Sequence, residues 1–142
     1  MCIRDRTDDD QIELSNLNRQ FLFRGKDVKK QKSVCAARVG KEMNADLNVH
    51  AFTNRVSPDT EEVFNEQFWY GIDGVLNALD NVKARKYVDS KCVFFEKPLF
   101  EAGTLGTMCN SQVIIPHKTQ CYSDGVDAPE QGIPMCLSLI HI

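Results

Sequence analysis

The chain lacks several features that would assign it at once to a class of protein. No run of apolar residues approaches the roughly 20 that a membrane-spanning helix needs. Positive charge is not in excess, because 17 lysines and arginines stand against 20 aspartates and glutamates, so the composition does not indicate a nucleic-acid partner. With 42% hydrophobic and 26% charged residues, the composition is ordinary for a globular domain.

The cysteines also lack a pattern of disulfides or paired metal ligands. No two of them form a CxxC pair, and those between Thr7 and Cys136 are odd in number. Such usage favours reduced thiols inside a cell over a disulfide framework or a zinc ribbon. The five cysteines in this range are Cys35, Cys92, Cys109, Cys121 and Cys136.

Both ends of the chain read like translated adaptor DNA. Residues 1–6 can be encoded by ATGTGTATAAGAGACAG and one further base, and the reverse complement of that string encodes residues 137–141 and the start of a codon for Ile142. A sequencing-library adaptor on both sides of an insert would produce this pair. We therefore expect residues 1–6 and 137–142 to be adaptor-derived, and we base the fold prediction on residues 7–136.

Apolar patterning alternates between strand-like and helix-like segments, which predicts an α/β domain with a mostly parallel sheet. In the first helix, Val28, Val34, Cys35, Val39 and Met43 are expected to share the buried face. In chain order we expect a strand end at 7–10, a helix over 28–44, a strand over 47–56, a helix from Ser57, a buried strand over 74–79, a helix capped by Asp80 or Asn81 and running through Lys91, strands over 93–95, 99–107 and 108–115, and irregular chain over 117–136.

Polar side chains follow two of the predicted strands, and parallel sheets bind ligands at that edge. Asp8 and Asp10 come after the first strand, where a carboxylate can accept hydrogen bonds from ribose hydroxyls; the alternative is a solvated acidic loop. Asp80 can either cap the next helix or hold a magnesium ion. Arg19 and Lys32 are cations that would attract phosphate in a dehydrated cleft, and the alternative for each is a surface charge.

Six separated blocks of sequence connect the chain to a known family. They are IELSNLNRQFLFR at 12–24, KS at 32–33, NALDNV at 77–82, EAGTLGT at 101–107, QVIIP at 112–116 and IPMC at 133–136. Their order and spacing resemble the second, catalytically active adenylation half of the ubiquitin-activating enzymes. The resemblance implies a THIF-type, Rossmann-like α/β fold that here lacks its first strand, glycine-rich loop and first helix. Residues 7–136 would then be a partial adenylation domain ending at the start of the catalytic-cysteine segment.

The resemblance also implies how such a domain would bind ATP. Asp8 would bind the ribose. Asn16, Arg19 and Lys32 would bind the phosphates, and the two cations would also neutralise charge during catalysis. Asn81 would complete the nucleotide site.

The metal and the nucleophile follow from the same resemblance. Asp80 would hold Mg²⁺, with Asp10 as a further contact of the ion. Cys136 is the expected nucleophile, because the family's thioester cysteine lies in an Ile-Pro-x-Cys-Thr-Leu context. MgATP would adenylate the carboxyl terminus of ubiquitin, Cys136 would take it over as a thioester, and a ubiquitin-conjugating enzyme would receive it. We expect such a protein in the cytoplasm and nucleus, with neither nucleic acid nor membrane as a partner.

The chain departs from the family at three points. The glycine-rich loop before the first aspartates is absent, the family-like sequence stops at Cys136, and Ala102 stands where related enzymes usually have serine. We therefore expect the chain as given to be inactive.

Other interpretations stay open. A subunit of a SUMO- or NEDD8-activating enzyme would share the SNLNRQ block, although the segment 120–123 lacks the second cysteine of the CxxC zinc pair those enzymes carry. A non-catalytic pseudo-adenylation scaffold is a second alternative, but such halves usually lose the set formed by Arg19, Lys32 and Asp80. A nicotinamide-dependent dehydrogenase is suggested by fold alone, and no catalytic histidine or lysine arrangement supports it.

Overall fold

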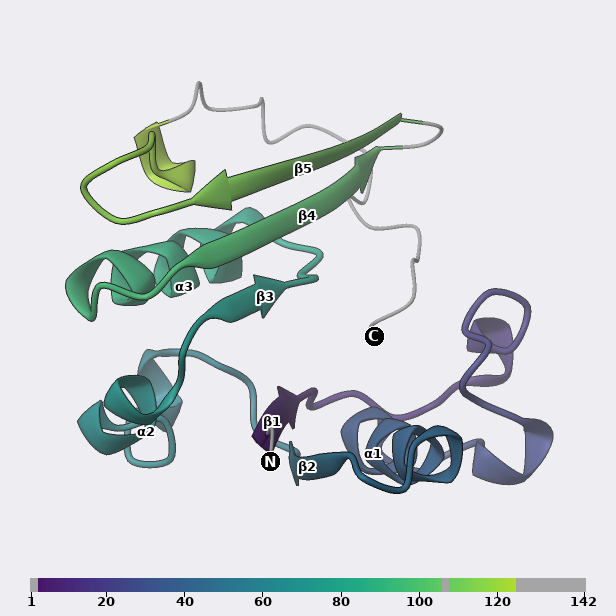
Figure 1. Cartoon of the computed structure of the whole chain (residues 1–142). Coiled ribbons are helices and arrows are strands. Elements are labelled where there is room, and N and C mark those ends of the chain that lie inside the picture. Colours follow the sequence, from purple (N-terminus) through teal and green to yellow (C-terminus); the bar gives the residue numbers. More distant parts are fainter. Residues whose placement is uncertain (1–2, 106–107, 125–142) are drawn as a thin grey trace. The chain divides into compact units, whose positions relative to one another are not determined.

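The computed structural model describes residues 3–105 and 108–124 of the chain (Figure 1). They divide between Arg55 and Val56 into two compact units, each with its own pair of parallel strands. Within the described ranges, no helix combines the length and the apolar character that crossing a membrane requires. The predicted α/β fold with parallel strands is thus confirmed.

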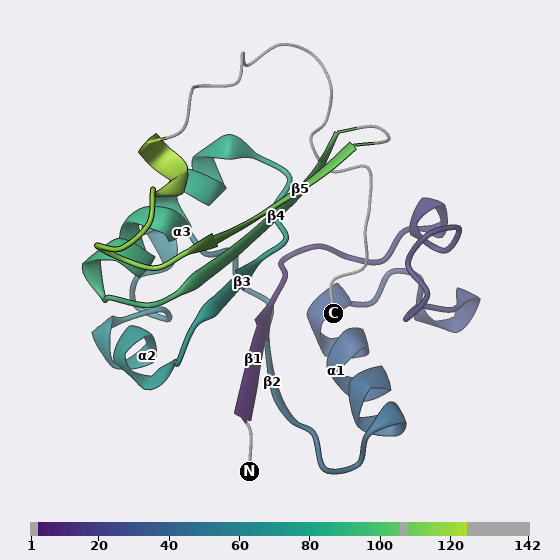
Figure 2. The ribbon, with the colours of Figure 1, turned by 45° about the horizontal axis from the view of Figure 1, so that its top comes forward.

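The first unit is a strand–helix–strand arrangement. β1 (Ile3–Thr7) and β2 (Asn48–Phe52) pair in parallel along their whole length. α1 (Lys32–Met43) lies between them in sequence and packs against this strand pair (Figure 2). Before α1 the chain forms two short 3₁₀ turns, η1 (Leu14–Asn16) and η2 (Gly25–Asp27). In this unit the carboxyl end of β1 and the amino end of α1 therefore lie close together.

β1 contains residues that the sequence analysis had set aside. We expected only a strand end at 7–10, whereas residues 3–6 form most of the strand and it ends at Thr7. A parallel ladder is built from backbone donors and acceptors, which the partner strand supplies whatever the side chains are. Asp8 and Asp10 do follow the strand directly, as predicted.

The buried face of α1 differs from the predicted one. Cys35 is buried as expected, together with Ser33 and Ala36, but Val34 and Met43 are 49% and 63% exposed. Val34 lies two residues from Lys32, which is about 200° around an α-helix and so on the opposite face. Met43 is the last helical residue, at the end of the helix rather than over its packed middle.

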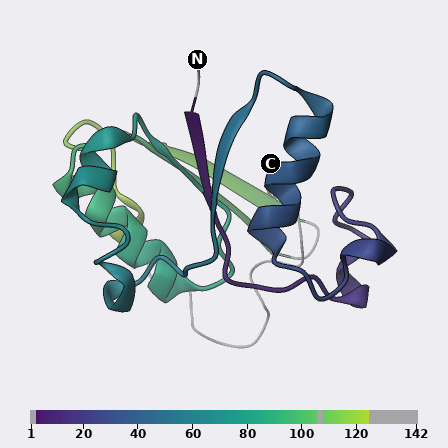
Figure 3. The ribbon, with the colours of Figure 1, turned by 90° about the horizontal axis from the view of Figure 1, so that it is seen from below.

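The second unit is a three-stranded sheet with two helices on one face. β3 (Val75–Asn77) runs parallel to β4 (Leu99–Leu105), and β4 is antiparallel to β5 (Met108–Ile114). α2 (Glu66–Gly71) and α3 (Val82–Phe94) cover the same face of this sheet (Figures 2 and 3). The core between helices and sheet is formed by Trp69, Val88, Cys92, Phe95, Leu99 and Ile114.

Two predicted elements of this unit are wrong. The helix expected from Ser57 is only a 3₁₀ turn, η3 (Pro58–Thr60), and the α-helix starts later at Glu66, where the Asn65 side chain accepts a hydrogen bond from the Phe68 amide at 3.1 Å. The strand expected over 93–95 is instead the end of α3. An apolar run of that length fits either a strand or a buried helix end, and here Phe95 enters the core from the helix.

We predict that Phe95→Ala lowers the free energy of unfolding by about 3–5 kcal/mol, because the buried ring stacks on Trp69 with centroids 5.8 Å apart. The matched control is Phe94→Ala. Because the Phe94 ring is 73% exposed, its removal should lower the free energy of unfolding by only about 1 kcal/mol. Denaturant titration followed by the fluorescence of the single tryptophan measures both variants. Equal losses in the two would contradict the described core.

Candidate functional site

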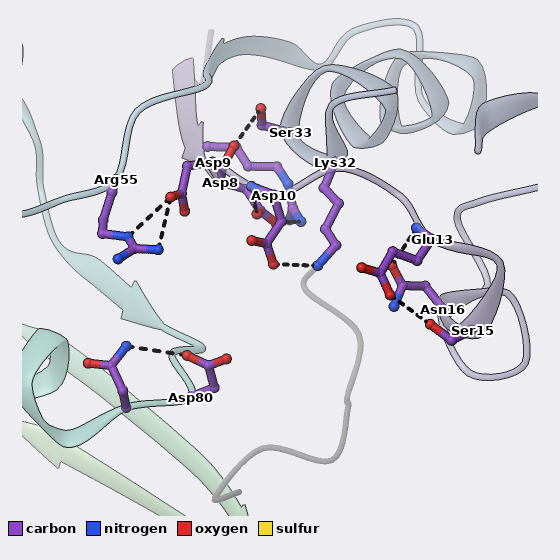
Figure 4. A network of polar contacts seen from close by, with 12 residues as sticks. Asp8, Asp9, Asp10, Glu13, Ser15, Asn16, Lys32, Ser33, Arg55 and Asp80 are labelled. Carbon is purple, nitrogen blue, oxygen red and sulfur yellow. Dashed lines mark hydrogen bonds and ion pairs between the residues drawn. The ribbon is translucent and has the colours of Figure 1, made fainter. Parts of the chain in front are cut away.

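The first candidate cluster lies where β1 ends and α1 begins (Figure 4). Lys32 is the first residue of α1, and its Nζ lies 2.7 Å from Oδ2 of Asp10. Its backbone N–H also donates to the Asp10 carbonyl oxygen at 3.0 Å. The loop after β1 is therefore joined to the start of α1 by a backbone hydrogen bond and by a side-chain ion pair. The structure brings these two predicted site residues together.

The two partners differ in their access to water. Lys32 is buried, with 11% of its side chain exposed, whereas 60% of the Asp10 side chain is exposed. A largely buried ammonium is stabilised by a carboxylate at this distance. An exposed carboxylate that already contacts a cation keeps oxygen atoms available for a further ligand. The pair is thus an anchored cation with an accessible acidic edge.

Three consecutive aspartates follow β1, and each is next to a cation. Asp10 contacts Lys32, Asp9 contacts Arg55 at 3.1 Å, and Asp8 lies 3.8 Å from Arg6. One carboxylate oxygen of each aspartate lies within 4.8 Å of the other two. Burial lowers the pKa of the Arg6 guanidinium, and the nearby Asp8 charge opposes that shift. The cations offset the repulsion of three like charges.

Asp8 is also tied into its own loop. Its Oδ1 accepts a hydrogen bond from the Asp10 amide at 3.1 Å, and its carbonyl oxygen accepts one from the Ser33 hydroxyl at 3.3 Å. The second contact joins the loop to α1 one residue beyond Lys32. The side chain is 15% exposed, so a ribose contact would use the remaining oxygen edge of a well-anchored carboxylate.

Of the predicted phosphate ligands, Asn16 is the last residue of η1, and Arg19 lies in the turn that follows it. Asn16 is buried, and its Oδ1 accepts a hydrogen bond from the Glu13 amide at 3.0 Å. The exposed Arg19 guanidinium donates to the Ser15 carbonyl at 2.7 Å and to Asn18 at 3.3 Å. Within residues 3–105 and 108–124, no carboxylate pairs with Arg19, whereas Lys32 is paired with Asp10. Arg19 is thus a surface cation held on its own turn.

The second candidate cluster lies after β3 in the other unit. Asn81 caps α3, since its Oδ1 accepts a hydrogen bond from the Ala84 amide at 2.8 Å. This decides the two capping alternatives for Asp80 and Asn81. The Asp80 carboxylate is exposed, and within residues 3–105 and 108–124 it accepts one hydrogen bond, at 3.3 Å, from the Asn81 side-chain amide. A carboxylate that does not cap the helix remains suited to a hard divalent cation.

Sequence analysis missed a buried polar network behind this turn. Arg85 on α3 donates to Glu101 on β4, and Glu101 also accepts a hydrogen bond from the Asn77 side chain at 2.7 Å. All three are buried. Asn77 lies in the block NALDNV and Glu101 lies in the block EAGTLGT. This membership was the only sign of the network in the sequence, and it predicted no role for either residue. Charged residues are almost never buried unpaired, so patterning alone places Arg85 on the surface.

The cysteines separate into buried and accessible thiols. Cys35 and Cys92 are buried, as predicted, and Cys109 is exposed. Burial raises the pKa of the Cys92 thiol to about 12, and the nearby negative charge of Asp89 is a second, smaller cause of this shift. Because the thiolate is the reactive form, Cys92 is unsuited to nucleophilic chemistry near neutral pH. Cys136, the expected nucleophile, lies outside the described residues.

We predict that iodoacetamide at pH 8 modifies Cys109 and leaves Cys92 and Cys35 unmodified until the protein is unfolded. The raised pKa keeps Cys92 protonated well above pH 8, and burial blocks access to both protected thiols. Peptide mapping by mass spectrometry before and after denaturation measures this. Equal labelling of Cys92 and Cys109 under native conditions would contradict the described packing.

Carboxylates after a parallel strand, paired with the lysine that starts the next helix, are typical of α/β proteins that bind a ligand at the carboxyl ends of their strands. The sequence profile of the ThiF family matches residues 6–139. The chain belongs to the ThiF family.

Similar proteins agree with this assignment. Ubiquitin-like modifier-activating enzyme 1 of Dictyostelium discoideum is 58% identical over 130 residues, covering 92% of this chain and 13% of that protein. Ubiquitin-activating enzyme E1 1 of Triticum aestivum and Ubiquitin-like modifier-activating enzyme 1 of Homo sapiens are each 55% identical over 130 residues, covering 92% of this chain and 12% of theirs. The chain thus spans about an eighth of the length of these relatives.

A solved structure with the same fold is that of E. coli MccB with AMPCPP and MccA. It has a TM-score of 0.72 and 27% identity, and the match covers 83% of this chain and 35% of that one. A second MccB structure, with MccA-N7isoASN, has a TM-score of 0.74 and 26% identity, covering 84% of this chain and 34% of that one.

Proposed function

We propose that this chain is part of the active adenylation half of a ubiquitin-activating enzyme, which uses MgATP to adenylate ubiquitin and then forms a thioester on a cysteine. The observation that carries the proposal is the Lys32–Asp10 pair at the end of β1, in a chain 55–58% identical to proteins named as such enzymes. A buried cation at the amino end of a helix is suited to bind phosphate. AMPCPP, an ATP analogue, in the similar MccB structure supports a nucleotide at such a fold.

The nucleotide roles follow the residues of the first unit. Asp8 would bind the ribose through its anchored carboxylate. Lys32 would contact the phosphates from the helix start, with Asn16 and Arg19 as further ligands. An exposed guanidinium held on a short turn can offer its remaining N–H groups to a phosphate oxygen. These cations would neutralise the charge that develops on the phosphate during adenylation.

The donor chemistry of the second unit fits magnesium. Asp80 presents an exposed carboxylate and would hold the ion, with Asn81 beside it on the same turn. Bound Mg²⁺ would neutralise phosphate charge and orient the phosphates for attack. Asn81 itself uses its amide oxygen to start α3, so its contribution to the nucleotide would come through the position of that helix end.

Cys136 is the proposed acceptor of the activated ubiquitin. Its thiolate sulfur would attack the carbonyl carbon of the acyl-adenylate, the bond from that carbon to the phosphate oxygen would break, and AMP would leave. Among the described cysteines, the buried Cys35 and Cys92 are unsuited to this step. The thioester would then pass to a ubiquitin-conjugating enzyme. We propose the cytoplasm and nucleus as the place of this activity.

Ubiquitin is the carrier that the observations support best. The relatives named above are ubiquitin or ubiquitin-like modifier activating enzymes, and the segment around Cys121 lacks a CxxC pair. SUMO- or NEDD8-activating subunits remain the alternative carriers. A non-catalytic scaffold is disfavoured because Arg19, Lys32 and Asp80 are all present.

We predict that, in the full-length protein, Asp80→Ala lowers ubiquitin-dependent ATP–pyrophosphate exchange at least about 100-fold and removes the thioester with it. Cys136→Ala should spare the exchange and remove only the thioester, because the thiol acts after adenylation. Exchange assays and non-reducing gels of the ubiquitin adduct measure the two steps.

Asp73→Ala is the matched control, since Asp73 is an exposed aspartate just before β3 and has no role in the proposed site. It should leave both steps unchanged. Equal loss of exchange in the Asp80 and Cys136 variants would contradict the proposed division of roles.

A further inference from the structure

The turn that contains Asp80 accepts a hydrogen bond from the buried guanidinium of Arg85. Arg85 is 3% exposed and Glu101 is 5% exposed, so this ion pair is removed from water. Breaking a buried pair leaves an uncompensated charge, whereas an apolar pair of similar size is often no less stable. The presence of the pair therefore calls for a role that apolar side chains would not fill.

The contacts of Arg85 supply that role. One guanidinium nitrogen, Nη1, donates to Glu101 and to the carbonyl oxygen of Ala102 at 3.0 Å, which fixes the group on β4. The other, Nη2, donates to the carbonyl oxygen of Leu79. Glu101 in turn holds Asn77, the last residue of β3, through a hydrogen bond of 2.7 Å. One side chain thus connects the strand end, the turn and the neighbouring strand.

These bonds lie on both sides of Asp80. The Leu79 carbonyl belongs to the planar peptide group that ends at the α-carbon of Asp80, so a fixed carbonyl oxygen also orients that α-carbon. On the other side, Asn81 is fixed by its cap bond to the Ala84 amide. The exposed carboxylate of Asp80 therefore stands on a backbone that is fixed before and after it.

Gly103 makes room for this arrangement. A β-carbon at this position would lie 3.2 Å from Nη1 and 3.3 Å from Nη2 of Arg85, closer than such contacts usually are. The guanidinium can lie against β4 at its present depth because residue 103 has no side chain. The glycine and the arginine therefore form one packing unit.

We infer that Arg85 is a positioning residue: through the Leu79 carbonyl it sets the Asp80 carboxylate for the magnesium ion of MgATP. The inference rests on the proposed function. Lysine cannot replace Arg85 in this role, because one ammonium cannot reproduce the planar fork that reaches Glu101 and Leu79 together.

The test is calorimetric binding of ATP to the full-length protein, with excess Mg²⁺ and with EDTA. The dissociation constant in EDTA divided by the dissociation constant in Mg²⁺ measures how much the metal strengthens ATP binding, independently of turnover. Arg85→Lys should reduce this ratio about tenfold, the usual scale for residues that orient metal ligands, and leave binding in EDTA unchanged. In an Asp80→Asn background, the same substitution should cause no further reduction, because the two residues act as one unit.

Asp89→Asn is the matched control. Asp89 is also buried on α3, one turn further on, but it accepts hydrogen bonds from Tyr122 and Ser123 instead of supporting the turn. It should lower thermal stability and leave the magnesium ratio unchanged. If Arg85→Lys does not fold, Gly103→Ala replaces it, since the added β-carbon would displace the guanidinium by a few tenths of an ångström.

The outcomes separate the inference from the function it rests on. Equal weakening of ATP binding with and without Mg²⁺, or a further tenfold reduction in the Asp80→Asn background, would overturn the role of Arg85 and leave the proposed function standing. A wild-type protein that binds no MgATP would contradict the proposed function before any variant is compared.

Discussion

The double connection of Lys32 to Asp10 is the constraint on which the candidate site of the first unit depends. The ammonium and the backbone N–H of the same residue both bond to one aspartate, so the start of α1 and the loop after β1 cannot move independently. The helix amino end carries partial positive charge in addition to the lysine. The partial charge of the helix end and the lysine therefore both lie beside the loop after β1, which contains Asp8, Asp9 and Asp10. The proposed binding of phosphate in the first unit depends on this geometry.

The second unit reaches a similar arrangement by different bonds. Its helix begins with the Asn81 cap rather than with a lysine, and the turn before it is fixed by Arg85 from the interior. Asp80 is the exposed acidic residue in this case. The buried charges of Arg85 and Glu101 pair with each other, and Arg85 also holds backbone carbonyl groups, which offsets part of the cost of removing the two charges from water.

Sequence reasoning succeeded where the signal was local. The β4 and β5 strands, the start of α3 at Asp80 or Asn81 and the burial of Cys35 and Cys92 all follow from short patterns of apolar residues and turn formers, and the structure then assigns the cap to Asn81. It failed where tertiary contacts decide. Val34 is apolar but lies opposite the packed face of α1, and Phe95 enters the core from a helix end rather than from a strand. Arg85 could not be identified as buried, because its partner Glu101 is remote in sequence and only the fold brings the two together.

The proposed activation of ubiquitin, rather than of SUMO or NEDD8, can be tested directly by comparing the three carriers. The full-length wild-type protein would be assayed for ATP–pyrophosphate exchange with ubiquitin, SUMO and NEDD8 in parallel, each with Mg²⁺ and with EDTA. We predict magnesium-dependent exchange with ubiquitin and none with the other two carriers. Ubiquitin binding without exchange would contradict it and favour a non-catalytic scaffold, and exchange only with SUMO or NEDD8 would contradict the assignment of the carrier.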